Sequence, residues 1–356
     1  MSLMCDWLTV VIECPHEPIP SGALIDCDAD GNVTRTIVKR TTVRSSFESS
    51  IQVKTNNVIT RDDGSRIGTQ LYLDGNFAKF LQGHNVFGSL DIPFLVAAGV
   101  QQALNQCQIP IYPFQLKRIM NGEFKVKRVD LTASYDCGTS ENVDHWLQSA
   151  SVMSRSRSGK PEITRGTVYF QKHSRRWSVK FYNKHREILK NKIPLHLLNS
   201  PIPAWTDGKL RAEVVIRSKE LQKIAEQQLD NADIYGSDLT PKFCSTLFNS
   251  YMERIDMSDV HRIPQSAALS LPNALRGTYE LWLNGFDMKS HLSTTTFYRH
   301  RREISSRLGV DISLPPPRAA RNNVVPLLRV IEAKPVEVPN HLLPYMIKRG
   351  DFNVAI

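Results

Sequence analysis

Tyr182 is the residue whose type and surroundings most suggest chemistry, because Lys184 and Glu187 follow it closely. A tyrosine phenol has a pKa near 10 and is a weak nucleophile at neutral pH. A nearby lysine cation favours the phenolate and stabilises the charge on an attacked phosphate. A tyrosyl phosphodiester keeps the energy of the broken linkage, so a cut strand can be rejoined without ATP. Packing is the alternative role, since the chain has 10 tyrosines.

Basic and aromatic residues alternate around this tyrosine. The segment 172–192 is rich in lysine and arginine, has Glu187 as its only acidic residue, and includes Trp177 and Phe181. Cations neutralise phosphates and rings stack on bases, so this pattern is typical of a surface that binds a DNA strand. The alternative is an exposed basic hairpin with ordinary core aromatics. The residues predicted to contact DNA in this part of the chain are Arg128, Arg175, Arg176, Trp177, Lys180, Arg186 and Arg211.

Two carboxylates lie on predicted strands, Asp130 in Arg-Val-Asp-Leu-Thr and Glu213 in Leu-Arg-Ala-Glu. Carboxylate oxygens suit Mg²⁺ or Mn²⁺, and either ion polarises a phosphate for attack. The alternation of a strand places Arg211 and Glu213 on one sheet face, where a salt bridge at a strand edge is the simpler explanation. Because Asp130 and Glu213 are far apart in the sequence, only the fold can bring them together.

A second basic region is predicted near the C-terminus. Residues 294–308 begin with hydroxyl side chains that can cap a helix, and Gly309 follows. With the predicted helix 274–283 they resemble a helix-turn-helix over 274–308, although the connection is longer than usual. Their polar side chains could meet phosphates or base edges, and a solvated basic helix is the alternative. The residues assigned to DNA contact here are Thr296, Tyr298, Arg299, Arg301 and Arg302.

The elements that must position these residues are read from apolar alternation and turn residues. The predicted strands are 8–12, 33–43, 48–54, 125–133, 167–170, 177–182 and 210–216, with turns at 28–32 and 62–64. The predicted helices are 93–107, 141–151, 184–190 and 218–228, with a mobile loop at 153–161. Strands joined mostly by hairpins indicate the α+β class, namely an antiparallel sheet with flanking helices and a smaller, mainly helical C-terminal region.

The composition limits the functional classes. The length of 356 residues is enough for one large domain or two ordinary ones, and the hydrophobic fraction of 41% supports a packed core. The net charge of +10 favours a polyanionic partner. The six cysteines contain no CxxC pair, which argues against structural zinc and for reduced thiols in a cytosol. The sequence shows neither a signal peptide, a membrane span nor a phosphate-binding loop.

Several motifs together resemble the gene II/X replication proteins of filamentous phages. Residues 81–88, Leu-Gln-Gly-His-Asn-Val-Phe-Gly, match the LQGHNVFG stretch of that family, and 322–327 match NNVVPL. The stretch 128–132 is similar to RIDAT, 174–187 to SR…YxKHxE and 210–213 to VRFE. The matches keep the order of the family, whereas the first 70 residues show none.

The resemblance implies a rolling-circle initiator, which is a site-specific single-strand endonuclease. Such a protein binds the double-stranded replicative form at the plus-strand origin, nicks one strand and leaves a 3′-hydroxyl primer. It later rejoins the displaced single strand into a circle. The implied partners are this DNA, a host helicase and a host DNA polymerase, in the cytoplasm of a bacterial host and without a membrane. The protein could oligomerise on DNA.

The resemblance also implies roles for individual residues. Tyr182 is the expected nucleophile, Lys184 its electrostatic neighbour, and Asp130 and Glu213 ligands of Mg²⁺ or Mn²⁺. Glu187 is a further candidate for catalysis, and Glu187 or His185 for a third ligand. The chain is expected to divide into a nicking and origin-binding domain, 1–235, and an accessory DNA-binding region, 236–356. The latter would contain the helix-turn-helix-like pair, a stiff proline linker at 314–317 and a strand at 323–330.

Two other functions stay open at this stage. A non-enzymatic origin-binding protein or repressor would protect DNA without cutting it. A metal-free tyrosine recombinase would nick in EDTA and would need a pocket rich in Arg and His. The better-known rolling-circle nickases bind metal through a His-hydrophobic-His motif. No two of the 10 histidines here are two residues apart, so a metal site must rest mainly on carboxylates.

Overall fold

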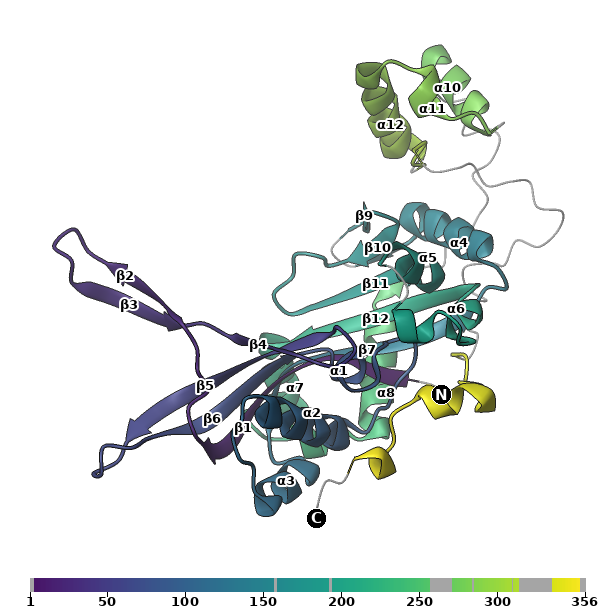
Figure 1. Cartoon of the computed structure of the whole chain (residues 1–356). Coiled ribbons are helices and arrows are strands. Elements are labelled where there is room, and N and C mark those ends of the chain that lie inside the picture. The colour runs from purple at the N-terminus through teal and green to yellow at the C-terminus, as the bar shows by residue number, and fades with distance from the viewer. Residues whose placement is uncertain are drawn as a thin grey trace.

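A computed structural model gives the fold of residues 3–156, 159–191, 194–256, 271–283, 285–308, 310–313 and 335–352. Its centre is a 10-stranded antiparallel sheet in the order β4-β5-β6-β1-β7-β12-β11-β10-β9, with β13 paired to β7 (Figure 1). The α+β class predicted from the sequence is confirmed. The strands of this sheet are β1 (Leu3–His16), β4 (Thr41–Arg44), β5 (Ser50–Thr60), β6 (Arg66–Gly75), β7 (Lys125–Asp136), β9 (Glu162–Thr164), β10 (Thr167–Phe170), β11 (Trp177–Asn183), β12 (Lys209–Arg217) and β13 (Ile234–Tyr235).

Two smaller strand pairs lie outside this sheet. The strand predicted at 33–43 is divided, and its first part, β3 (Val33–Val38), pairs with β2 (Ala23–Cys27) in an arm that projects from the sheet (Figure 1). The loop predicted at 153–161 contains β8 (Arg155–Ser156), which pairs with β14 (Ile255–Asp256). A short strand can therefore form where the sequence suggests only a loop, because its partner lies far along the chain.

Each predicted helix of the first 235 residues is present, and others accompany them. The helices up to residue 252 are α1 (Phe77–Gln82), α2 (Ile92–Gln106), α3 (Pro113–Met120), α4 (Ser140–Met153), α5 (Lys184–Lys190), α6 (Ile202–Trp205), α7 (Ser218–Gln228) and α8 (Pro241–Met252). The 3-10 turns are η1 (Leu195–Leu197), η2 (Gly236–Asp238), η3 (Asn340–Tyr345) and η4 (Arg349–Asp351). The start of α8 had a sequence signal that the prediction missed, since Thr240 caps it and Pro241 opens it.

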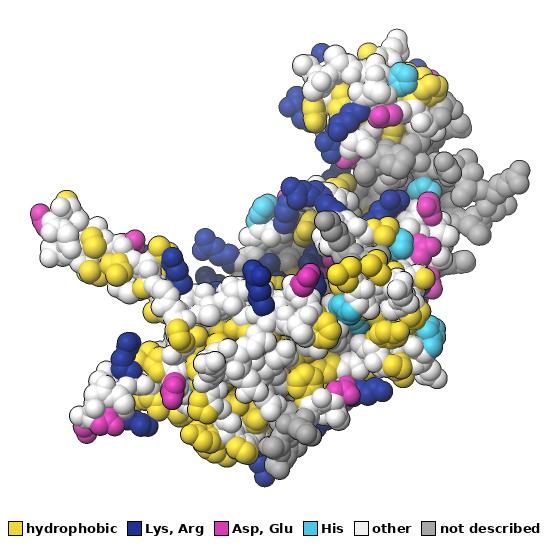
Figure 2. All heavy atoms as spheres, viewed as in Figure 1, with side chains coloured by type: hydrophobic (Ala, Val, Ile, Leu, Met, Phe, Trp, Pro, Cys, Tyr) yellow, Lys and Arg dark blue, Asp and Glu magenta, His cyan; other side chains and the backbone are white. Residues whose placement is uncertain are grey.

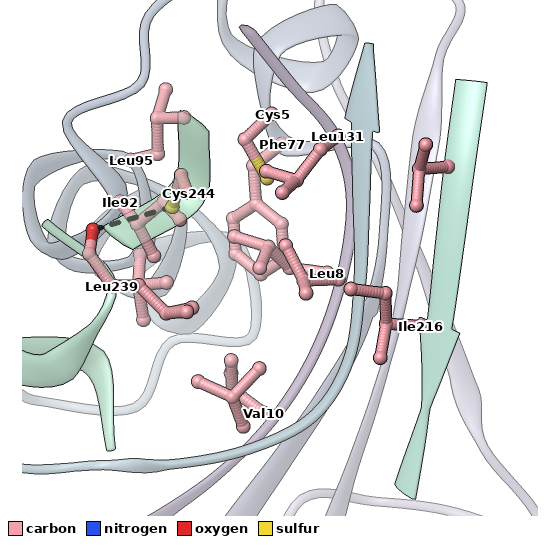
Figure 3. Close-up of a cluster of buried hydrophobic side chains, with 14 of the residues drawn as sticks. Cys5, Leu8, Val10, Phe77, Ile92, Leu95, Leu131, Ile216, Leu239 and Cys244 are labelled. Carbon is pink, nitrogen blue, oxygen red and sulfur yellow. Dashed lines mark hydrogen bonds between the residues drawn. The ribbon is translucent and has the colours of Figure 1, made fainter. Parts of the chain in front are cut away.

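One face of the sheet is apolar and carries the core. Leu8 and Val10 of β1, Leu131 of β7 and Ile216 of β12 point from the strands toward the helices. Figure 3 shows them against Phe77, Ile92, Leu95, Leu239 and Cys244. Since side chains alternate along a strand, the residues between them lie on the opposite, polar face. The candidate chemistry is on that second face.

A β-bulge in β1 breaks this alternation. Cys5 pairs with Leu131 and Trp7 pairs with Asp130, so Asp6 is an extra residue with no partner in the register. Because of the bulge, both Cys5 and Leu8 are buried in the core. A bulge re-aims side chains, and here it places Asp6 beside the strand that carries Asp130.

The C-terminal part of the described chain contributes to the same core. Cys244 and Phe248 of α8 are buried in the cluster that contains the sheet, although they follow the predicted boundary at 235. Leu342 packs with Val86 and Phe87 in a separate, smaller cluster. The division at 235 stays a prediction. Because α8 packs on the sheet, a shortened chain made to test this division should keep α8.

The helices predicted at 274–283 and 294–308 are present as α10 (Asn273–Leu283) and α12 (Thr294–Leu308), with their own apolar cluster. The long connection between them holds one further helix, α11 (Met288–His291). The predicted linker 314–317 and strand 323–330 lie outside the described residues. Among the described residues, no helix combines the length and apolar character that crossing a membrane requires.

Candidate functional site

Tyr182 contacts Glu213 across the pairing of β11 with β12. Its phenolic oxygen donates a hydrogen bond of 3.4 Å to Oε2 of Glu213, and Nζ of Lys180 is 2.7 Å from Oε1. The contact with Lys180 follows from the strand register, which pairs Lys180 directly with Glu213. Glu213 is buried, whereas Tyr182 is half-buried. The carboxylate is therefore placed to accept the proton of the phenol.

The ionisation of this pair is governed mainly by burial. Burial raises the pKa of Tyr182 well above its ordinary value, the Glu213 carboxylate adds to the rise, and the Arg211 guanidinium opposes it. Burial also raises the pKa of Glu213 to about 8, against the influence of Lys180 and with a contribution from Asp6. Tyr182 is thus a neutral phenol in this state, and it needs a base to become a nucleophile.

Asp130 lies on the same polar face, on the neighbouring strand β7. It accepts two hydrogen bonds from Arg128, of 2.8 Å from Nε and 2.6 Å from Nη2, and is 1% exposed. Burial raises the pKa of Asp130, which Arg128 and Lys180 oppose and Asp6 increases. The fold therefore brings together the two carboxylates that the sequence could not relate, and each has a cation beside it.

Asp6 and Asn85 are site residues that the sequence prediction missed. Oδ1 of Asp6 accepts hydrogen bonds from Nδ2 of Asn76 (2.7 Å) and Nδ2 of Asn85 (3.0 Å). Nζ of Lys184 donates to Oδ1 of Asn85 at 2.9 Å and lies 2.7 Å from Oε2 of Glu187. A signal for Asp6 was present, because it is an isolated acid in an apolar strand.

Lys184 is a fully buried positioning group in this arrangement. Its side chain is 1% exposed, and burial lowers its pKa against the influence of Glu187. Its ammonium group connects the first turn of α5 to the loop after α1. The sequence predicted Lys184 as the electrostatic neighbour of the phenol. Its hydrogen bonds are to Asn85 and Glu187, and its role beside Tyr182 stays a prediction.

The carboxylates of the site suit a divalent cation in part. Asp130 and Glu213 supply hard oxygen donors on adjacent strands, and Asp6 adds a third negative charge near them. His185 instead has Nδ1 2.9 Å from Oγ1 of Thr206. Within the described ranges, no group of three or more His, Cys, Asp or Glu is arranged to hold a metal ion. Asp130 and Glu213 therefore fit the chemistry of Mg²⁺ or Mn²⁺, and His185 as their third partner stays a prediction.

The predicted DNA contacts around β11 differ in their accessibility. Arg175, Arg176 and Arg186 are exposed, although Arg176 is 3.1 Å from Oε2 of Glu220 and Arg186 donates from Nε to Asp144 at 2.5 Å. Trp177 is half-buried and packs against Tyr251. Figure 2 shows lysine and arginine side chains gathered around a hollow in this part of the molecule.

The structure corrects the prediction for Arg211. Its side chain is fully buried, with Nη2 donating to the backbone oxygen of Val86 and Nη1 3.3 Å from Sδ of Met4. A guanidinium in this position cannot contact DNA at the surface. Nor is β12 an edge strand, as the salt-bridge alternative required, because it lies between β7 and β11. Arg211 instead fixes the loop that carries Asn85.

The predicted contacts on α12 differ in their exposure. Tyr298, Arg299 and Arg302 are exposed. Arg301 makes two hydrogen bonds of 2.6 Å to Asp311, and the hydroxyl of Thr296 accepts one from Ser293. The exposed side of α12 therefore keeps an aromatic ring and two cations for a partner.

His84 couples the loop beside the site to pH. Nε2 is 3.0 Å from the backbone oxygen of Tyr345, which assigns the proton to Nε2, and Nδ1 faces the N–H of Val86 at 3.4 Å. Burial lowers the pKa of His84 from 6.5 to about 4. The unfolded chain therefore takes up a proton at a higher pH than the folded chain, so stability is complete above about pH 6.5 and falls as the pH falls toward 4.

We expect replacement of His84 by glutamine to flatten this pH dependence. At one pKa unit per 1.36 kcal/mol, the wild type should lose about 3 kcal/mol of unfolding free energy through this histidine between pH 7.5 and pH 4. Urea denaturation at both pH values measures the loss, and the exposed His173→Gln is the matched control. An equal loss in His84→Gln and wild type would contradict the assignment.

Comparison with known proteins identifies the family. Residues 4–238 match the N-terminal family model of the phage replication-associated protein of gene II, and residues 263–344 match the C-terminal one. The chain is 35% identical over 341 residues to the replication-associated protein of this type from Enterobacteria phage I2-2, covering 95% of this chain and 96% of that protein.

A solved structure, that of a rolling circle replication initiator protein from Geobacillus stearothermophilus, is similar with 14% identity and a TM-score of 0.32, covering 72% of this chain and 86% of that one. The family membership rests on the two sequence matches, which span most of the chain. They confirm the resemblance to the gene II replication proteins, and the chain belongs to the phage gene II replication-associated protein family.

Proposed function

We propose that this protein initiates rolling-circle replication by nicking one DNA strand at an origin, with Tyr182 as the nucleophile. The observation that carries the proposal is the hydrogen bond from the Tyr182 phenol to the buried carboxylate of Glu213 in a chain of the gene II replication-associated family. A phenol with a raised pKa is unreactive alone, and an adjacent carboxylate supplies the base that it needs.

In the proposed step, the phenolic oxygen of Tyr182 forms a bond to the scissile phosphorus while its proton passes to Glu213. The bond between phosphorus and the 3′-oxygen breaks, and that oxygen leaves as a 3′-hydroxyl after taking up a proton. The product is a 5′-phosphotyrosyl strand and a free primer end. The reverse attack, by the 3′-hydroxyl of the displaced strand, rejoins the DNA into a circle.

Positive groups beside the reacting oxygen support this chemistry. Lys180 is 2.7 Å from Glu213 and its ammonium group is 5.7 Å from the centre of the Tyr182 ring, so it lies close to the expected position of the phosphate. Asp130 and Glu213 would hold Mg²⁺ or Mn²⁺, which when bound would neutralise charge on the phosphate. Lys184 and Glu187 would act by fixing Asn85 and the start of α5.

The proposal also covers the binding of the origin DNA and the host proteins that use the nicked strand. Exposed Arg175 and the exposed face of α12, with Tyr298, Arg299 and Arg302, would bind the duplex origin. The 3′-hydroxyl would serve a host polymerase, with a host helicase separating the strands, in the cytoplasm of a bacterial host. We place the nicking function in residues 1–235 and the accessory function in the remaining chain.

Removal of divalent metal should abolish nicking. Supercoiled plasmid carrying the cognate origin should be converted to the open circle with Mg²⁺, stay supercoiled in EDTA, and be cut again after excess Mg²⁺ is restored. Gel electrophoresis measures the conversion, and a plasmid without the origin is the control. Equal nicking in EDTA would favour a metal-free tyrosine recombinase, and binding without any nicking would favour a non-enzymatic origin-binding protein.

A further inference from the structure

The polar face of the sheet carries aromatic side chains outside the nicking site. Trp7 on β1 and Tyr72 on β6 lie three and four strands from β11 in the sheet order. Each ring has a cation over its face, with Arg128 at 5.2 Å from the Trp7 ring centre, and Arg40 at 4.8 Å and Lys54 at 5.3 Å from that of Tyr72. These pairs continue the sequence of cation and aromatic groups that begins with Lys180 and Tyr182.

Neither ring belongs to the apolar core. Tyr72 stands between Leu71 and Leu73, which are fully buried on the other face, so alternation turns Tyr72 away from the core. Trp7 follows the bulge at Asp6, which turns its side chain off the core face as well. Both rings are half-buried. Packing of the core therefore gives no reason for an aromatic side chain at either position.

One carboxylate, that of Asp74, binds the Trp7 ring directly and also binds the Arg40 cation that lies over Tyr72. Oδ1 of Asp74 accepts a hydrogen bond of 2.9 Å from Nε1 of Trp7 and another from the hydroxyl of Thr9, and Oδ2 is 2.7 Å from Nη1 of Arg40. Asp74 lies directly across from Thr9 in the strand pairing. A ring held by a hydrogen bond, as Trp7 is, loses little freedom when a flat partner stacks on it, which favours binding.

We propose that this surface, the Trp7–Tyr72 face, binds single-stranded DNA on one side of the scissile phosphate. Bases would stack on Trp7 and Tyr72, and Arg40 and Lys54, whose side chains are long and flexible, would move from ring to phosphate as a base arrives. A duplex cannot use these rings because its bases are already stacked. The inference rests on the proposed function, since it assigns the path of the strand that Tyr182 cuts.

Binding of an oligonucleotide tests the face without relying on cleavage. Fluorescence anisotropy with labelled oligo-dT would be measured in a Tyr182→Phe background, where the strand stays intact. Trp7→Leu and Tyr72→Leu should each weaken binding by about tenfold to a hundredfold, as expected for one stacked base, while Trp7→Phe should restore most of the affinity. Lys54→Gln should lower the slope of affinity against salt by about 0.7, the value for one phosphate contact of a single strand.

A matched control is available on the other side of the sheet. Tyr112 and Phe114 stack on each other at the start of α3 and are 55% and 61% exposed, and α3 packs on α2 in the helical layer. Tyr112→Leu and Phe114→Leu should leave binding of oligo-dT unchanged. Thermal unfolding of every variant separates a loss of binding from a loss of folding. Lys54→Gln removes a cation and no aromatic ring, so it tests the phosphate contact separately from stacking.

The outcomes are distinguishable from those of the nicking proposal. The proposal for the Trp7–Tyr72 face would be overturned if the folded variants Trp7→Leu and Tyr72→Leu bound oligo-dT with wild-type affinity and Lys54→Gln kept the wild-type salt slope. This holds whether or not Tyr182 nicks. An equal loss for duplex and single-stranded DNA would also overturn it, because it would show phosphate binding without stacking. A selective loss for single strands supports the face even if the nucleophile is another residue.

Discussion

Replacement of Tyr182 by phenylalanine is expected to abolish nicking of origin DNA while leaving binding intact. Phenylalanine keeps the aromatic ring at this position of β11 and removes only the oxygen that lies 3.4 Å from Glu213. Without this oxygen no tyrosyl phosphodiester can form, so nicking should fall on the order of 10⁴-fold or more, as for other covalent nucleophiles. Supercoiled origin plasmid measures the rate, and electrophoretic mobility shift measures binding.

Tyr169→Phe is the matched control for this experiment. Tyr169 lies on β10, directly across from Lys180, and is also half-buried on the same sheet. It should nick at the wild-type rate. If Tyr182→Phe nicked normally and Tyr169→Phe did not, the nucleophile would be Tyr169. If both nicked normally, a water molecule would be the attacking group, and no protein should remain attached to the 5′ end after denaturation.

Replacement of Glu213 by glutamine is expected to lower nicking by about 10²- to 10⁴-fold, the usual contribution of a general base. The amide has the same shape, but it cannot take the proton of Tyr182 and it leaves Lys180 without its carboxylate. The pKa of Glu213 is raised, and only its ionised form accepts a proton. At limiting Mg²⁺, wild-type nicking should therefore increase as the pH rises through about 8, because accepting the proton and binding the metal both need the ionised carboxylate. This limb should be absent in the variant.

A second buried glutamate–tyrosine pair supplies the control for Glu213. Oε1 of Glu220 accepts a hydrogen bond of 2.8 Å from the hydroxyl of Tyr251, and Glu220 is 4% exposed. Glu220→Gln should reduce stability without changing the pH profile of nicking, because this pair lies between α7 and α8. If Glu213→Gln kept the wild-type rate and pH profile, Glu213 would be neither the base nor an essential metal ligand.

The sequence determined the elements that carry Tyr182. Apolar alternation in 167–170 and 177–182 and the polar turn between them predict the hairpin that the structure contains as β10 and β11. The same local rule identified β7 and β12 and therefore placed Asp130 and Glu213 on strands. Local patterns suffice for these features because side-chain period and turn chemistry act over a few neighbouring residues.

Only the tertiary structure decided how these residues combine. The antiparallel pairing of β7, β12 and β11 puts Asp130, Glu213 and Tyr182 on one face, and this order involves contacts between strands that are far apart in the sequence. The same packing buries Arg211, which its sequence neighbourhood suggested as a DNA contact. Whether a charged side chain on a strand is buried depends on what packs over that strand. Arg211 is buried because the loop after α1 packs over it.

The first residues of the chain show most clearly what local sequence patterns could not predict. No motif marked them, yet the bulge in β1 places Asp6 beside the strand that carries Asp130, and places Trp7 on the open face. A bulge changes which side chains face the core, and its position is fixed by pairing with β7, a strand distant in the sequence. The sequence by itself thus determined the strand that carries Tyr182 and its basic surroundings, while the long-range register of the sheet determined the carboxylates, lysines and aromatic rings that lie around it.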